Sequence, residues 1–526
     1  MADYVIVGAG SAGCVLANRL SADPATTVTL IEAGGSDRDL NVRIPAAFAN
    51  QFHGRLDWDF QTEPEPAVDG RSLYIPRGKM LGGSSSMNAM LYVRGRPLDY
   101  DLWERQGAAG WGWRDVLPYF MRSEDNVRGK SEFHSTGGEL TVSDQRSPRP
   151  LDRRLLEASA AVGIPRIADY NGPEQDGVAM AQVTQRNGRR WSCADAFLRP
   201  ALKRPNLELI SRATVLALEL DGTRATGVRY RRRGRERIVR AGREVILAAG
   251  AIGSPQILLL SGIGPPDHLR KVGVDVRHEL PGVGRNLQDH PFITLLYELS
   301  DAGPTLYGAD KPRHLAEWML RRSGPLTSSA AEVFAFVRTR SGLPAADIQF
   351  HMGALYFEDH GQEEFDGHAM TIAPVLVAPR ARGSVWLRSA DPLAKPRILT
   401  NSLSEAEDVE SLVAGMKLAR EIAAQPPLSG MVAREIKPGA DVTDRDALEA
   451  DLRRRLMLIY HPVGTCRMSD EGEDAVVDSQ LRVHGISGLR VADASVMPTI
   501  PGGNTNAPTI MIAEKASDLI AGGGSS

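Results

Sequence analysis

Two polar residues near the C-terminal end of the chain have the types needed to move a proton and hold an oxygen. His461 precedes Pro462, which favours an extended, loop-like backbone, and Asn504 lies in the segment Gly503–Asn506. An imidazole with a pKa of about 6.5 accepts a proton near neutral pH. A neutral amide donates a hydrogen bond without competing as a base. Such a pair suits acid–base chemistry on a small molecule.

The N-terminal segment predicts the element that would bind a partner for this chemistry. Tyr4–Val7 is a short apolar run, typical of a buried parallel strand, and Gly8-x-Gly10-x-x-Gly13 follows it directly. Residues 14–20 then have helical spacing. Strand, glycine turn and helix N-terminus together form a site for a pyrophosphate, so Gly8, Gly10, Ser11 and Gly13 are predicted to bind a dinucleotide. An ordinary glycine-rich turn is the alternative.

A second strand supports this interpretation. Val28–Ile31 is apolar and ends at Glu32, about 20 residues after the turn, where a carboxylate accepts hydrogen bonds from ribose hydroxyls. The same carboxylate would repel a 2′-phosphate, which argues against NADP. Redox chemistry with a bound dinucleotide is therefore the first functional prediction.

Composition agrees with a soluble enzyme. The 526 residues exceed one typical core, and 42% apolar and 24% charged residues are ordinary for a globular protein. A net charge of −3 gives no reason to expect nucleic acid as a partner. The three cysteines form neither a disulfide framework nor a metal-binding motif, so we predict no metal site and a cytoplasmic location.

Three further stretches have simple structural interpretations. The apolar stretch 245–260 is interrupted at Gly253-Ser254-Pro255, so it predicts a strand, a glycine turn and a helix rather than a membrane span. The segment 229–243 holds eight arginines and predicts a solvated hairpin turning at Arg233-Gly234, with a polyanion-binding patch as the alternative. Residues 522–526 predict a flexible tail.

Several motifs, taken in order along the chain, resemble the glucose–methanol–choline (GMC) oxidoreductase family, most closely its choline-dehydrogenase-like branch of FAD-dependent alcohol dehydrogenases and oxidases. They are Gly8–Gly13, Glu32–Gly34, Gly78–Asn88, Gly250–Gln256, Gly284–Pro291, His461–Met468 and Val491–Pro498. The match runs over nearly the whole chain.

The resemblance implies an α/β protein with a Rossmann-like FAD-binding domain and an interleaved substrate-binding domain built on an antiparallel sheet. The implied FAD-binding segments are 1–135, 190–295 and 455–526, and the implied substrate-binding segments are 136–189 and 296–454. It further assigns Val215 to the adenine and Asp493 and Ala494 to the pyrophosphate. It places Gly82, Gly83, Ser84, Asn88 and Thr505 along the cofactor.

One position departs from part of the family. Some relatives carry a flavin-linked histidine in the Ser-Ser-His-Asn version of the loop, whereas this chain has Met87. Because methionine cannot form that bond, we predict that FAD is held non-covalently.

The resemblance assigns the catalytic roles as well. His461 matches the catalytic histidine, and Asn504 occupies the second active-site position, where some members have histidine. His461 would then abstract the hydroxyl proton of a primary alcohol alone, while a hydride passes to flavin N5 and the aldehyde forms. His290 is expected to be a supporting residue. Asn506 and Pro508 predict the start of a helix whose positive end faces the flavin.

Substrate contacts are harder to locate. Glu332 stands in the apolar run 330–337, where alternation puts it on one face with Phe334 and Phe336, so it is predicted to be half-buried. It is either a substrate-binding carboxylate or the partner of a nearby arginine. Tyr356 and Phe357 are expected to end a strand and to line a pocket. No aromatic cage with an acidic neighbour is visible in the sequence.

Two other classes of function remain open. Some hydroxynitrile lyases have this fold and run acid–base chemistry on it, and a non-catalytic flavoprotein is also conceivable. The expected partners are a small alcohol and either oxygen or another electron acceptor. The sequence does not distinguish an oxidase from a dehydrogenase, because that depends on oxygen access to the flavin.

Overall fold

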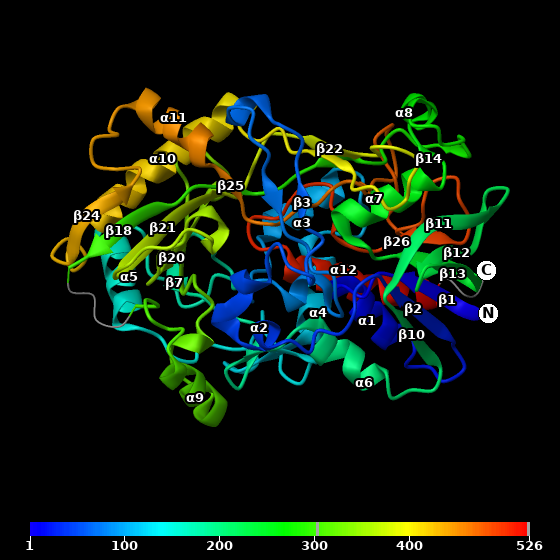
Figure 1. The fold of residues 1–526 in the computed structure, drawn as a ribbon, viewed down its shortest axis with the longest axis horizontal. Coiled ribbons are helices and arrows are strands. Elements are labelled where there is room, and N and C mark those ends of the chain that lie inside the picture. Colours follow the sequence, from blue (N-terminus) through cyan, green and yellow to red (C-terminus); the bar gives the residue numbers. More distant parts are fainter. Residues whose placement is uncertain (301–304, 523–526) are drawn as a thin grey trace.

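Two large sheets lie at opposite ends of an elongated molecule (Figure 1). The protein's computed structural model describes residues 1–300 and 305–522. The N-terminal strands, the arginine-rich hairpin and the C-terminal helix gather at one end, and the second sheet occupies the other. The architecture is a mixed α/β fold, as predicted.

The first sheet has a parallel core. Its strands β10, β2, β1, β13 and β26 follow one another in that order and all run parallel. Their bounds are Leu207–Ser211, Val28–Glu32, Ala2–Val7, Arg235–Leu247 and Leu489–Val491. Every residue of β2 is buried, as expected for a strand covered on both faces. The two predicted strands, Tyr4–Val7 and Val28–Ile31, are confirmed.

Three helices point their N-termini at this sheet's carboxyl edge, and two differ in detail from prediction. They are α1 (Ser11–Leu20), α7 (Gly250–Leu260) and α12 (Asn506–Gly522). Helix α7 includes the predicted turn Gly253-Ser254-Pro255. Pro255 has no N–H for the carbonyl of Ala251, and that carbonyl accepts from the Thr465 hydroxyl at 2.6 Å instead, which compensates the proline within the helix.

The other difference concerns Asn506, which is the first residue of α12 rather than a residue before it. Its Oδ1 accepts from the Ser11 hydroxyl at 2.7 Å, so its side chain ties α12 to α1. The predicted helix itself is confirmed, and it packs against α1 and α4 (Trp113–Ser123).

The arginine-rich segment forms the predicted hairpin. Strands β11 (Ala213–Asp221), β12 (Arg224–Arg232) and β13 pair antiparallel, and most of the residues that β13 adds beyond the parallel core are exposed. Arg233 and Gly234 connect β12 to β13 with φ of 50° and 76°. Positive φ at both turn residues is typical of a two-residue hairpin turn.

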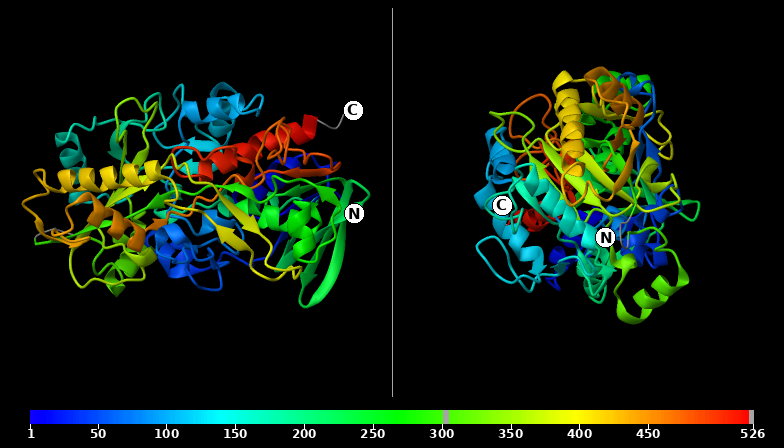
Figure 2. Two further views of the ribbon diagram at one scale, coloured as in Figure 1. Left: turned by 90° about the horizontal axis from the view of Figure 1, so that it is seen from above. Right: turned by 90° about the vertical axis from the view of Figure 1, so that its left-hand side faces the viewer.

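The second sheet is antiparallel, as the fold prediction required. Its main path is β24, β18, β21, β20, β19 and β7, with β17 and β25 joined at the side. The bounds of these strands are Val432–Lys437, Leu295–Leu299, Ala369–Leu376, Ile348–Gly353, Val333–Val337, Gly177–Met180, Pro291–Phe292 and Met457–Leu458. Helices α5 (Pro150–Ala161) and α10 (Ala406–Ala423) pack on it (Figure 2). The exact domain boundaries stay a prediction.

The predicted alternation along β19 is confirmed. The prediction that a strand ends at Tyr356 and Phe357 is wrong. Phe334 and Phe336 face one hydrophobic cluster, and Val333, Ala335 and Val337 face another. Strand β20 ends at Gly353, so Tyr356 and Phe357 lie in the following loop. Gly353 passes close to the carbonyl of Ala330, 1.9 Å from where a Cβ would stand, so a side chain does not fit at the end of this strand.

Further helices are α3 (Pro97–Arg105), α9 (Pro312–Arg321) and α11 (Arg445–Arg455). Within the described ranges, no helix combines the length and apolar character needed to cross a membrane. The predicted tail beyond Gly522 lies outside the described residues.

Candidate active site

A single cavity of about 550 Å³ reaches from the glycine turn to the His461–Asn504 pair. This volume is within the usual range of about 300–1,000 Å³ for ligand and cofactor sites. The cavity brings together most of the predicted cofactor residues: Gly8, Gly10, Ser11, Glu32, Gly83, Ser84, Asn88, Val215, Asp493, Ala494 and Thr505. Gly13 and Gly82 do not line the cavity; they belong to the glycine turn and to the loop Gly78–Asn88.

The glycine turn is packed so closely that side chains are excluded. A Cβ on Gly13 would lie 1.8 Å from the carbonyl oxygen of Gly8, which itself has φ of 101°. At Gly10 the nearest atom to an added Cβ is 4.0 Å away, on the open side that faces the cavity. Gly13 therefore permits strand–helix packing, while Gly10 leaves backbone accessible to a ligand.

Glu32 is buried and already bonded to backbone. Its two oxygens accept from the N–H groups of Ala9 at 2.8 Å and Gly34 at 2.6 Å, and burial raises its pKa. A carboxylate has about four acceptor positions, so Glu32 retains capacity for ribose hydroxyls. The side chain both fixes the turn and faces the cavity.

Asp493 holds the N-terminus of α7. Its Oδ2 accepts from Gly250 N at 2.8 Å and from the Ser254 hydroxyl at 2.6 Å, and burial raises its pKa. Its neighbour Ala494 lines the cavity, and Val215 lines it from β11. The predicted pyrophosphate residue thus positions helix α7 in addition to facing the cavity.

The predicted flavin loop closes against the glycine turn. It forms a short helix, η3 (Gly83–Ser86), and a Cβ on Gly83 would lie 2.7 Å from Gly10 Cα. Asn88 accepts from Arg190 Nη1 at 2.8 Å, which fixes its amide beside the cavity. Met87 is buried and lines the same wall.

His461 and Asn504 form a bonded pair with His290 behind them. Asn504 Nδ2 lies 3.2 Å from His461 Nε2, and His461 Nδ1 lies 3.0 Å from His290 Nδ1. Because an amide nitrogen only donates, His461 Nε2 carries the lone pair, and His461 Nδ1–H donates to His290. Burial lowers the pKa of His461 well below its usual value, so the ring is neutral and basic at Nε2.

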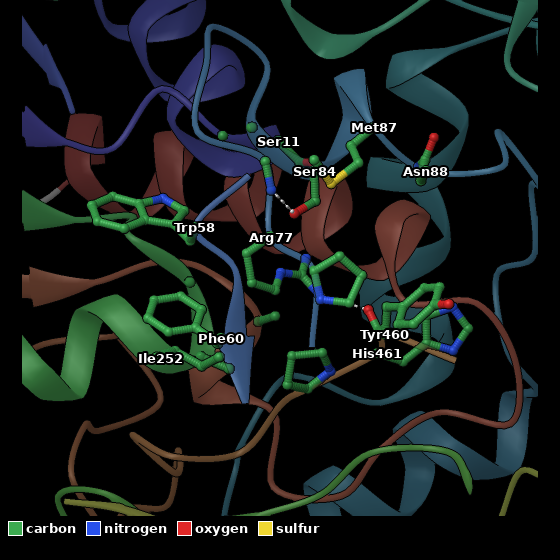
Figure 3. Close-up of a pocket in the computed structure, with 18 of the residues that line it drawn as sticks. Ser11, Trp58, Phe60, Arg77, Ser84, Met87, Asn88, Ile252, Tyr460 and His461 are labelled. Carbon is green, nitrogen blue, oxygen red and sulfur yellow. Dashed lines mark hydrogen bonds between the residues drawn. The ribbon is translucent and has the colours of Figure 1, made fainter. Parts of the chain in front are cut away.

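The peptide between Tyr460 and His461 is held from both sides. Tyr460 has φ of 70°, a left-handed conformation that a tyrosine rarely adopts. Arg77 Nη1 donates to the Tyr460 carbonyl at 2.6 Å, as Figure 3 shows, and Asp289 Oδ1 accepts from His461 N at 2.7 Å. Burial raises the pKa of Asp289 to about 7. The side chains of Arg77 and Asp289 therefore fix the backbone of the predicted base.

The three predicted substrate residues have different positions. Phe357 lines the cavity. The Tyr356 hydroxyl donates to Glu363 at 2.5 Å, and Tyr356 lies outside the lining. Glu332 is also outside the lining, 1% exposed and paired with Arg149. The geometry favours the second alternative for Glu332, the partner of an arginine.

Sequence reasoning missed many residues that line the cavity, among them Phe48, Phe52, Arg77 and His351. His351 is buried on β20 with no partner for its Nε2 among the described residues, and burial lowers its pKa to about 3. A histidine between the apolar residues Phe350 and Met352 was a usable signal. The rings of Phe48 and Phe52, four residues apart, gave none beyond ordinary core packing.

These residues fit a dinucleotide cofactor at one end and a reacting molecule at the other. The glycine backbones and the N-terminus of α1 supply N–H groups and a positive potential for phosphates. Glu32 supplies the ribose acceptor, and the His461–Asn504 pair faces the far end of the same cavity.

Comparison with known proteins decides which family this is. Two family models, both described as GMC oxidoreductase, match residues 2–292 and 379–513. The chain belongs to the GMC oxidoreductase family. FAD is accordingly the cofactor for which this cavity is built, and the cavity end at Gly10 fits it.

Similar proteins span the full length of the chain. An alcohol dehydrogenase [acceptor] of Pseudomonas putida is 43% identical over 99% of this chain and 96% of its own. Human mitochondrial choline dehydrogenase is 43% identical over 99% of this chain and 89% of its own. The crystal structure of pyridoxine 4-oxidase from Mesorbium loti matches with a TM-score of 0.90 and 33% identity, over 98% of this chain and 99% of that one.

Proposed function

We propose that this GMC oxidoreductase oxidises a primary alcohol to an aldehyde, with His461 as the base. The observation that carries the proposal is the lone pair of His461 Nε2, held beside Asn504 on the cavity that also contains the nucleotide-binding turn. The relatives named as alcohol and choline dehydrogenases act on substrates with the same CH–OH group.

The chain's own residues supply the proton transfer. The substrate hydroxyl donates its proton to His461 Nε2, and the Asn504 amide N–H stabilises the negative charge that develops on the oxygen. When bound, FAD supplies the acceptor for the hydride that leaves the carbon. His290 orients the imidazole through Nδ1, and the N-terminus of α12 places a positive potential at the cofactor.

We further propose that FAD is bound non-covalently, because Met87 occupies the loop position that would carry the link. His461 and Asn504 are the proposed catalytic residues, and oxygen or another acceptor completes the cycle.

The test is anaerobic bleaching of the flavin absorbance band by a panel of primary alcohols, followed by admission of air. Bleaching by an alcohol supports oxidation, and the rate of recovery in air separates an oxidase from a dehydrogenase. His461→Ala should keep its FAD and reduce the bleaching rate by about 10²–10⁴-fold, the usual share of a general base. A flavin that no alcohol bleaches would favour the lyase or the non-catalytic alternative.

A further inference from the structure

Six apolar side chains form a chamber beside His461. We call Phe48, Phe52, Met87, Leu355, Phe357 and Tyr460 the apolar chamber; all six line the cavity and belong to one hydrophobic cluster. The ring of Phe52 lies 5.9 Å from that of Phe48 and 5.6 Å from that of Tyr460. The Phe48 and Phe357 rings stack at 6.3 Å. The chamber is thus built mainly of aromatic faces.

Carboxylates line this cavity only at its nucleotide end. Among the described residues of the lining, Glu32 and Asp493 are the two acidic ones, and both belong to the turns at the carboxyl edge of the parallel sheet. The chamber therefore lacks an acidic lining residue within the described part of the chain.

Glu332, the acidic residue closest in sequence to the lining residues Ala330 and Ala331, is withdrawn from the cavity. Its carboxylate forms an ion pair with Arg149, whose side chain is 6% exposed, and Glu332 itself is 1% exposed. If this buried carboxylate bound a second cation, Arg149 would lose its partner, which is energetically costly.

The carboxylates of Glu358 and Asp289 are near the chamber, and both accept hydrogen bonds. Glu358, next to Phe357, pairs with Arg455 at 3.1 Å and accepts from the Thr294 hydroxyl. Asp289, behind His461, accepts from two backbone N–H groups and lies outside the lining. Neither carboxylate lines the chamber.

The fixed charge that does line this part of the cavity is positive. Arg77 faces it between Met87 and Tyr460 (Figure 3), and its guanidinium is bonded to the Tyr460 carbonyl. A cationic substrate would meet this charge at short range, and it would lose its hydration without gaining a counterion. Attraction to the aromatic faces compensates only part of that loss.

We infer that the substrate is a neutral, apolar primary alcohol, aromatic or branched aliphatic, and that quaternary ammonium alcohols are poor substrates. This inference rests on the proposed function. By this inference, the substrate of this protein is uncharged, unlike the choline named for the similar choline dehydrogenases.

A matched pair of alcohols tests the inference directly. Choline and 3,3-dimethylbutan-1-ol have nearly the same shape and differ in the charge of one atom, and benzyl alcohol serves as a flat neutral reference. We expect kcat/KM for 3,3-dimethylbutan-1-ol to exceed that for choline by about tenfold or more, measured by flavin reduction in the holoenzyme. Equal or better use of choline would overturn the inference while leaving alcohol oxidation intact. If none of the three alcohols reduces the flavin, the proposed function fails together with the inference.

A variant locates the preference in the chamber. Phe48→Ala should raise KM for 3,3-dimethylbutan-1-ol by about tenfold and leave the limiting rate of flavin reduction within about twofold, because the ring binds the alkyl group rather than the reacting atoms. Phe365→Ala is the matched control, since Phe365 stacks on Tyr356 outside the lining. An unchanged KM in Phe48→Ala, with FAD content preserved, would contradict the assignment of the chamber.

Discussion

Replacing Arg77 by methionine should slow flavin reduction by about two- to threefold through the backbone of His461. The left-handed conformation of Tyr460 costs about 1–2 kcal/mol, and each hydrogen bond from a charged group returns about 1.5–3 kcal/mol. With both Arg77 and Asp289 in place, the two bonds outweigh the cost. Without Arg77, one bond roughly balances the cost, so the productive backbone conformation falls to about a third to a half of the population and the rate falls by about two- to threefold.

The assay is stopped-flow flavin reduction with a saturating alcohol, alongside FAD content and thermal unfolding. Arg71→Met is the matched control, because Arg71 donates to the carbonyls of Arg453 and Leu456 outside the cavity lining. It should affect unfolding without slowing flavin reduction.

A double-mutant cycle isolates the backbone effect. In a Tyr460→Gly background the left-handed conformation has no steric cost, so Arg77→Met should slow the reaction less than it does in the wild type. An equal loss in both backgrounds, or a near-normal rate in Arg77→Met alone, would refute the reasoning.

Three further predictions concern pH, the cofactor link and the glycine turn. The pKa of Asp289 is raised to about 7, and its carboxylate accepts from the His461 N–H. The rate of flavin reduction should therefore increase with pH through about 7, as this carboxylate becomes charged. Asp289→Asn should abolish this increase, and an identical pH profile in the variant would assign it to another group. Acid or heat denaturation should release FAD into the supernatant, since Met87 forms no bond to it, and flavin that precipitates with the chain would contradict this. Gly10→Ala should yield a folded protein with little FAD. Gly13→Ala should also lower the melting temperature, because its Cβ would lie 1.8 Å from a carbonyl oxygen. Equal melting temperatures for the two variants would be inconsistent with this packing.

Local patterns predicted the elements whose geometry depends on neighbours in sequence. The apolar runs Tyr4–Val7 and Val28–Ile31 form buried parallel strands, since strands covered on both faces need continuous apolar sequence. The turn at Arg233-Gly234 was predictable for the same local reason. Errors occurred where a distant group changed a local rule, as at Pro255, whose missing N–H is compensated by Thr465.

The substrate end of the cavity depended on partners far away in sequence. Glu332 alone was compatible with substrate binding or with an ion pair, and Arg149, 183 residues away, favours the second. Nothing near Tyr460 in sequence indicates that Arg77, 383 residues away, holds its carbonyl. Such contacts depend on how the two sheets and their loops meet, which no local periodicity encodes.

By itself, the sequence determined the cofactor-binding turn from the spacing of its glycines and apolar residues. The fold class and the candidate residues His461 and Asn504 followed from the resemblance of short motifs to a known family. Only the tertiary structure decided that His461 is neutral with its lone pair at Nε2, that Glu332 is withdrawn from the cavity, and that rings rather than carboxylates surround the reacting end. The physical reason is that protonation, pairing and burial are properties of surroundings assembled from separate segments, whereas a motif specifies only the residues within it.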